Sequence, residues 1–157
     1  MLRLALIVAG AVLVSDQVTK WLILAKVMDP PRIIEVTGFF NLVLVWNRGI
    51  SFGLLGNSAG WQSWVLAAFG AVVAGGLLVW LHRAVQGLLP SLGIGLIVGG
   101  ALGNVIDRLR FGAVVDFLDF HVGGWHWPAF NVADSAITIG VAMLVLDAIL
   151  HDRAEKA

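Results

Sequence analysis

Four long apolar stretches, separated by segments richer in polar residues, organise this chain. The first is interrupted by polar residues between Ser15 and Lys20 and then resumes, so the whole stretch is read as one membrane-crossing segment. A helix needs about 20 mainly apolar residues to cross a bilayer, and each stretch approaches or exceeds that length. The pattern therefore predicts four transmembrane helices, at about residues 4–26, 62–81, 88–108 and 132–150.

The two longer connections, at about residues 27–61 and 109–131, show a different pattern. The run from Phe39 to Trp46 is aromatic and β-branched and is too short to span as a helix, which is typical of a strand. Backbone near lipid must be paired or covered, so we expect this strand in a small sheet over the helix ends. Trp125, Trp127 and Phe130 in the second connection suit an interfacial aromatic belt.

These elements predict an all-α membrane protein: four transmembrane helices with a small interfacial β-rich loop region on the outer face, in one domain over residues 1–157. Composition supports the membrane class, since 59% of the residues are hydrophobic and only 13% are charged. The net charge is zero and no basic run occurs, which excludes nucleic acid as a partner class. The absence of cysteine excludes disulfides, thiolate metal sites and cysteine nucleophiles.

Polar residues gather on one side of the predicted membrane protein. Helix 1 leaves the membrane where helix 2 enters, and helix 3 leaves where helix 4 enters, on the same side. A charged side chain in or beside the hydrocarbon is costly and is a functional-site candidate by default. One site at one membrane face is therefore predicted, although the count of lysine and arginine does not decide which face it is. The residues on this side include Asp16, Lys20, Asn47, Asn104, Asp107, Arg108, Asp116 and Asp134.

Asp116 and Asp134 are the leading candidates for chemistry. Asp116 follows two valines, and its only other explanation is a solvated strand beside the bilayer. Asp134 lies three residues after Asn131, the spacing of a capping box, and capping is compatible with catalysis. Two carboxylates held close together cannot both ionise cheaply, so such a pair shares one proton and suits general acid–base chemistry. Asp119 is expected to share a strand face with Asp116 and competes as the second carboxylate.

Other polar features have structural explanations that compete with a functional one. Asp16 and Lys20 are spaced i to i+4 and could form a self-neutralising pair. Asn104, Asp107 and Arg108 could be a helix end with an arginine that reaches the interface.

Two further patterns carry no predicted chemistry. Asp119, His121 and His126 resemble metal ligands, but their spacing fits no usual motif, so we predict no metal and no cofactor. The four-residue spacing of Gly95, Gly99 and Gly103 predicts close helix packing in lipid.

Two rival hypotheses come from other functional classes. A small transporter or channel would line a polar path across the membrane, yet the stretch from Trp64 to Leu81 has no polar residue and the polar groups cluster on one side. An assembly factor built on the glycine-rich third helix would tolerate loss of Asp116, whereas an enzyme would not.

Five segments, in order along essentially the whole chain, carry a resemblance to a known family. Together they resemble the motif blocks of the bacterial lipoprotein signal peptidases, also called signal peptidase II. One small departure is Ile50-Ser51, where the family often has two small residues, which bears on the substrate groove. The segments are Asp16 to Lys20, Asn47 to Gly53, Gly99 to Arg108, Val115 to Phe117, and Phe130 to Asp134.

The resemblance implies a multi-pass aspartic endopeptidase of the bacterial cytoplasmic (inner) membrane, with its site near the periplasmic or extracellular face. Its substrates would be prolipoproteins, cleaved just before a diacylglyceryl-modified cysteine. Expected partners are membrane lipids and the inhibitor globomycin, and the chain is expected to act as a monomer. Asp116 and Asp134 match the family's catalytic pair. Positions matching substrate-binding or supporting residues are Asp16, Lys20, Asn47, Gly100, Asn104, Arg108, Asn131 and Ala133.

Overall fold

Four membrane-length helices form the body of the protein. The structure, a computed structural model, describes residues 1–49, 60–84 and 87–155. Each helix is long and apolar enough to cross a membrane, which confirms the four predicted spans. The helices are α1 (Leu2–Leu22), which continues as the π-helix η1 (Ile23–Val27), α2 (Gly60–Arg83), α3 (Leu88–Phe111) and α4 (Val132–Glu155).

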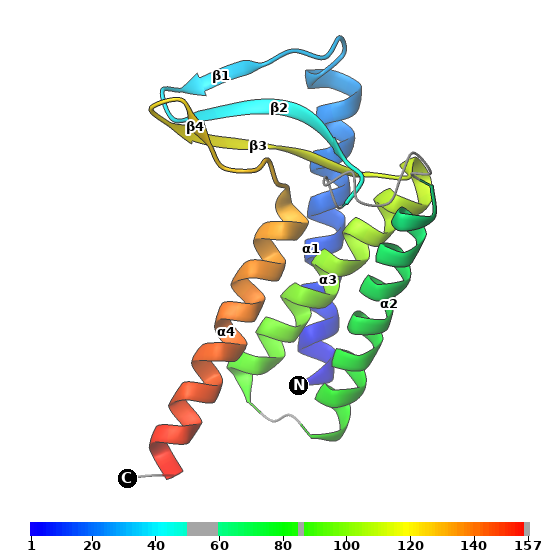
Figure 1. Cartoon of the computed structure of the whole chain (residues 1–157). Helices are drawn as coiled ribbons and strands as arrows, with labels where there is room; N and C mark the ends of the chain where they lie inside the picture. Colours follow the sequence, from blue (N-terminus) through cyan, green and yellow to red (C-terminus); the bar gives the residue numbers. More distant parts are fainter. Residues whose placement is uncertain (50–59, 85–86, 156–157) are drawn as a thin grey trace.

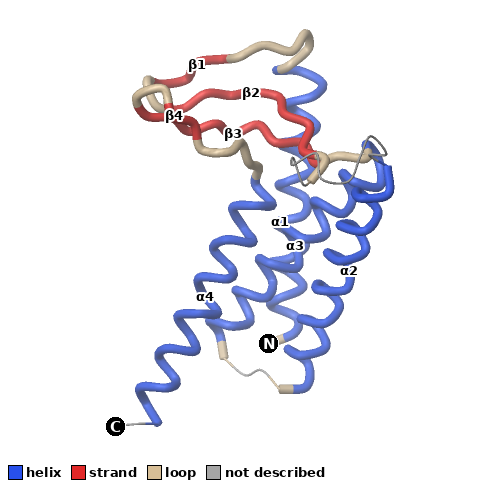
Figure 2. The backbone as a smooth tube through the Cα atoms, in the orientation of Figure 1, coloured by secondary structure: helices blue, strands red, loops and turns tan. Residues whose placement is uncertain are grey.

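A small antiparallel sheet lies across one end of the helices, and the N-terminus lies at the other end (Figures 1 and 2). The strands occur in the order β1-β2-β3-β4, so the two long connections are joined edge to edge through β2 and β3. The predicted strand within Phe39 to Trp46 is confirmed as β2. The strands are β1 (Ile34–Thr37), β2 (Phe40–Asn47), β3 (Val114–Val122) and β4 (Trp125–His126).

The helix α3 is the centre of the bundle and packs against each of the other three helices (Figure 1). Its glycines allow close contact with α1. A Cβ atom added at Gly95 would lie 2.7 Å from the carbonyl oxygen of Ala5, and one at Gly99 would lie 2.6 Å from that of Ala9. The predicted close packing is confirmed, and the small residues on both helices are the reason for it.

The ends of α3, β3 and α4 meet where the sheet joins the bundle. Gly112 caps the C-terminus of α3 with a positive φ of 69°, which suits glycine, and β3 begins two residues later. The backbone N–H groups of Phe117 and Leu118 donate to the carbonyl oxygen of Phe130, at 3.0 and 2.9 Å. These bonds hold the start of α4 against β3 and so bring Asp116 close to Asn131.

Candidate active site

Asp116 is almost fully buried, at 1% exposure, and its carboxylate is held by amides. Asn131 Nδ2 donates to Asp116 Oδ1 at 2.7 Å, and Asn47 Nδ2 donates to Asp116 Oδ2 at 2.9 Å. Asn47 reaches it from the end of β2, because β2 pairs with β3 and places Val45 opposite Asp116. Both carboxylate oxygens are therefore oriented by neutral donors from different elements.

Asp134 sits in the first turn of α4 and forms a reciprocal capping box with Asn131. The backbone N–H of Asp134 donates to Asn131 Oδ1 at 2.9 Å, and the backbone N–H of Asn131 donates to Asp134 Oδ2 at 3.2 Å. The remaining oxygen, Oδ1, accepts a hydrogen bond of 2.8 Å from Asn104 Nδ2. The capping box predicted from the spacing is confirmed, and Asn131 links this box directly to Asp116.

The pKa of Asp116 is raised to about 6. Burial is the largest cause, and the negative charge of Asp134 also raises it, whereas hydrogen bonds from Asn47 and Asn131 and the charge of Lys20 lower it. Burial removes water that would solvate the carboxylate, so the protonated form is favoured. A carboxylic acid with this pKa can hold a proton close to neutral pH.

A second acidic cluster lies beside this pair and is organised around Lys20. The ammonium Nζ lies 2.8 Å from Asp16 Oδ2 and 2.8 Å from Asp107 Oδ2, and it donates to Asn104 Oδ1 at 3.1 Å. All three charged side chains are buried, at 3% exposure or less. The predicted pairing of Asp16 with Lys20 is therefore present, and Asp107 from α3 joins it.

Both aspartates also accept hydrogen bonds from the backbone. Asp16 Oδ1 accepts from the N–H of Ala133 at 3.0 Å, and Asp107 Oδ2 accepts from the N–H of Val115 at 3.1 Å. The Lys20 cluster thus supports the residues that immediately precede Asp134 and Asp116.

Arg108 lies on the same face of α3 as Asn104. Its Nη1 donates to the carbonyl oxygen of Asn104 at 3.3 Å, while its Nε is buried and has no hydrogen-bond partner among the described residues. The carboxylates of Asp107, Asp116 and Asp134 all act on it electrostatically. The buried Nε–H group of Arg108 is therefore a donor without an acceptor among the described residues.

Small residues let α3 approach α1 and α4 at the level of the site. A Cβ atom at Gly100 would collide with the carbonyl oxygen of Ala133, and one at Gly103 would lie 2.5 Å from Asp16 Oδ2. Ala133 itself is fully buried. Gly100 and Ala133 therefore support the site through packing.

The expectation that Asp119 shares a face with Asp116 is wrong. The two residues are three positions apart on a strand with alternating faces, so they point to opposite sides of the sheet. Asp119 instead accepts hydrogen bonds of 2.9 Å from Asn41 Nδ2 and from His126 Nδ1. Although burial opposes the shift, these hydrogen bonds lower its pKa. Asp119 stabilises the sheet and is not brought to Asp134.

Sequence reasoning gave no role to Gln17, which the structure places in the Lys20 cluster. Its Nε2 donates to Asp107 Oδ1 at 3.0 Å and to the carbonyl oxygen of Gly103 at 3.3 Å. The available signal was its position beside Asp16 within a polar interruption of an apolar stretch. The segment from Ile50 to Gly53, part of the second motif block, lies outside the described residues.

Comparison with known proteins identifies the class to which this fold and site belong. The family model described as "Signal peptidase (SPase) II" matches residues 8–150. The chain belongs to the signal peptidase II family, a family of peptidases, which confirms the resemblance found in the sequence. This membership favours a peptidase over the transporter and assembly-factor hypotheses.

Particular relatives carry a more specific description. The chain is 50% identical over 140 residues to a lipoprotein signal peptidase of Azoarcus sp. (strain BH72), covering 89% of this chain and 79% of that protein. It is 49% identical over 149 residues to a lipoprotein signal peptidase of Paraburkholderia phymatum, covering 95% of this chain and 89% of the relative. A solved structure described as a bacterial membrane enzyme superposes with a TM-score of 0.81 at 34% identity, over 98% of this chain and 91% of the other.

Proposed function

We propose that this chain is a lipoprotein signal peptidase that cleaves prolipoproteins just before a diacylglyceryl-modified cysteine, with Asp116 and Asp134 as an aspartic catalytic pair. One observation carries the proposal. Asn131 hydrogen-bonds both carboxyl groups, and among the described residues no lysine or arginine forms an ion pair with either. Two acids held together without a paired cation favour a shared proton.

In this mechanism Asp116 is the acid and Asp134 is the base, because burial favours protonated Asp116. The Asp134 carboxylate takes a proton from a water, whose oxygen adds to the scissile carbonyl carbon. Asp116 hydrogen-bonds the carbonyl oxygen and then gives its proton to the leaving amine as the C–N bond breaks. The proton on Asp134 then restores the starting state of the pair. No step uses a metal or cofactor.

The surrounding residues orient the substrate and the pair. The unused Nε of Arg108 supplies a hydrogen bond to a substrate carbonyl oxygen, and Asn104 and Asn47 fix the two carboxylates. Asp16 and Lys20 form an ion pair next to the two carboxylates, and Gly100 and Ala133 allow the helices to pack closely there.

The same proposal places the protein in its membrane. It is a monomer of the bacterial cytoplasmic (inner) membrane, with cytoplasmic termini and with the sheet and site at the periplasmic or extracellular face. Membrane lipids surround α1 to α4, and globomycin inhibits cleavage.

The test is cleavage of a diacylglyceryl-modified prolipoprotein by the purified protein in detergent. The native protein is expected to cut before the lipidated cysteine and not to cleave the unlipidated precursor. Its activity is expected to persist with a chelator and to be lost with globomycin. Asp119→Asn is the matched control for Asp116→Asn, because both replace a buried carboxylate of β3. Full activity of Asp116→Asn or of Asp134→Asn would refute the pair.

A further inference from the structure

A hollow of about 350 Å³ runs from the candidate site along the outer side of α4. It begins at Asp134 and follows the first turns of α4, beneath two aromatic residues of the segment that leads into the helix. Because α4 packs mainly on α3, its other side faces away from the bundle. The hollow is lined by Trp127, Phe130, Asp134, Ser135, Thr138 and Ile139.

The hydroxyl groups in this hollow are already satisfied within α4. Ser135 Oγ donates to the carbonyl oxygen of Asn131, and Thr138 Oγ1 donates to that of Asp134, both at 2.9 Å. Each hydroxyl hydrogen therefore points along the helix backbone, and neither is free to donate to a ligand. Below Asp134 the hollow consequently offers mainly carbon surface.

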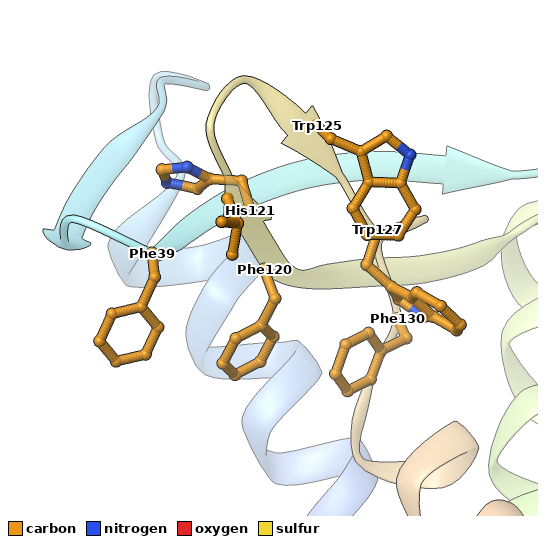
Figure 3. Close-up of a pocket in the computed structure, with 7 residues that line it drawn as sticks. Phe39, Phe120, His121, Trp125, Trp127 and Phe130 are labelled. Carbon is orange, nitrogen blue, oxygen red and sulfur yellow. The ribbon is translucent and has the colours of Figure 1, made fainter.

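The aromatic wall of the hollow continues under the sheet. Trp127 and Phe130 also line a neighbouring hollow of about 460 Å³. There the rings of Phe39, Phe120 and Phe130 form a row beneath the sheet (Figure 3). The ring centroid of Phe120 lies 6.5 Å from that of Phe39 and 5.8 Å from that of Phe130. A long apolar group that starts beside Asp134 would therefore contact apolar surface both beneath the sheet and along α4.

We propose that the hollow along α4 binds one acyl chain of the substrate's diacylglyceryl group and thereby sets the position of the scissile bond against Asp134. This inference rests on the proposed function. Two features favour an acyl chain as the occupant. The hollow opens on the lipid-facing side of a membrane-spanning helix, and it ends at a carboxylate of the catalytic pair. A chain held there would align the modified cysteine with the pair before water attacks.

Filling the hollow tests the proposal. Ile139→Trp places a large ring in it, whereas Val145→Trp places the same ring on an exposed position of α4 about 9 Å further along the helix. With a long-chain substrate, Ile139→Trp is expected to lower kcat/KM about tenfold, the change that two buried methylene groups account for. With a short-chain substrate kcat/KM is expected to change less than about twofold, and Val145→Trp is expected to behave like the native protein.

Equal kcat/KM values for Ile139→Trp and native protein with the long-chain substrate would overturn the proposal, as would an equal fall in Val145→Trp. If the native protein cleaved no lipidated substrate, the proposed function itself would fail, which is a different result. Thermal unfolding in detergent checks that both variants are folded.

A second measurement identifies the lipid that occupies the hollow. A photoreactive group on the acyl chain of the substrate is expected to label Thr138 or Ile139, and unlabelled substrate is expected to compete. Equal labelling by a photoreactive phospholipid, without competition by substrate, would show a bulk-lipid site and overturn the assignment.

Discussion

Two acidic clusters lie side by side at the sheet end of the bundle and are neutralised in different ways. In the first, the ammonium group of Lys20 lies 2.8 Å from both Asp16 and Asp107. In the second, Asp116 and Asp134 are held by the amides of Asn47, Asn104 and Asn131. An ammonium partner fixes a carboxylate in its charged form, whereas amides orient a carboxylate and leave its proton exchangeable. This difference suits the first cluster to structural support and, in the proposed function, the second cluster to proton transfer.

The largest expected effect comes from breaking the amide-held pair. Asp116→Asn and Asp134→Asn are each expected to lower kcat by about 10²- to 10⁴-fold, because each removes one end of the proton transfer. Since the two residues act as a unit, the double variant should be little worse than either single variant. Single-turnover cleavage of the lipidated substrate measures this. Multiplicative losses in the double variant would show that the two carboxyl groups act independently.

Removing the ammonium group from the Lys20 cluster should mainly lower the stability of the fold. Lys20→Met leaves Asp16 and Asp107 buried without their cation and is expected to destabilise the protein by about 3–5 kcal/mol. Thermal and denaturant unfolding in detergent measure the loss. Lys26→Met, which removes an exposed lysine near the end of the same span, is the matched control and should change stability by less than about 0.5 kcal/mol. Adding Asp107→Asn to Lys20→Met should recover part of the loss.

The pH dependence of cleavage sharpens the comparison. Because the proton on Asp116 is needed and its pKa is about 6, kcat/KM should fall as pH rises through about 6 in the free enzyme. Asn47 lowers that pKa by hydrogen-bonding the carboxylate, so Asn47→Ala should raise it and move the falling limb up by about one pH unit. Asn41→Ala, which removes an asparagine that binds Asp119 instead, should leave the limb in place.

The smallest effect is expected at Asp119, the carboxylate outside both clusters. Asp119→Asn weakens its bond to the half-exposed His126 and should cost about 1 kcal/mol of stability, while kcat/KM stays within about twofold of native. Unfolding and cleavage assays on one preparation test both statements. A loss of activity comparable to that of Asp116→Asn would contradict the role given to Asp119.

The sequence allowed the spans, the strand and the cap to be predicted because each depends on local pattern. Apolar length determined α1 to α4, the aromatic and β-branched run determined β2, and the three-residue spacing from Asn131 to Asp134 determined the capping box. The glycine spacing in α3 likewise required only that neighbouring helices approach closely.

Contacts between distant elements were harder to predict. Gln17 joins Asp107 across 90 positions, and Asn47 reaches Asp116 only because β2 pairs with β3 around a bulge between Leu42 and Val45. The error at Asp119 has a different origin: its separation from Asp116 is odd, and an odd separation reverses the face of a strand.

The shared hydrogen bonds of Asn131 restrict which residues can occupy that position in descendants of this chain. A helix N-cap by itself accepts serine, threonine, aspartate or asparagine with little difference. Here the same side chain accepts from the N–H of Asp134 and donates to Asp116, and it is fully buried. Aspartate would keep the cap but bring a third negative charge to the pair, and serine would be too short to reach both partners. A position that is permissive in most helices is thus narrowed to a single residue type, and selection on the enzyme also acts on the start of α4.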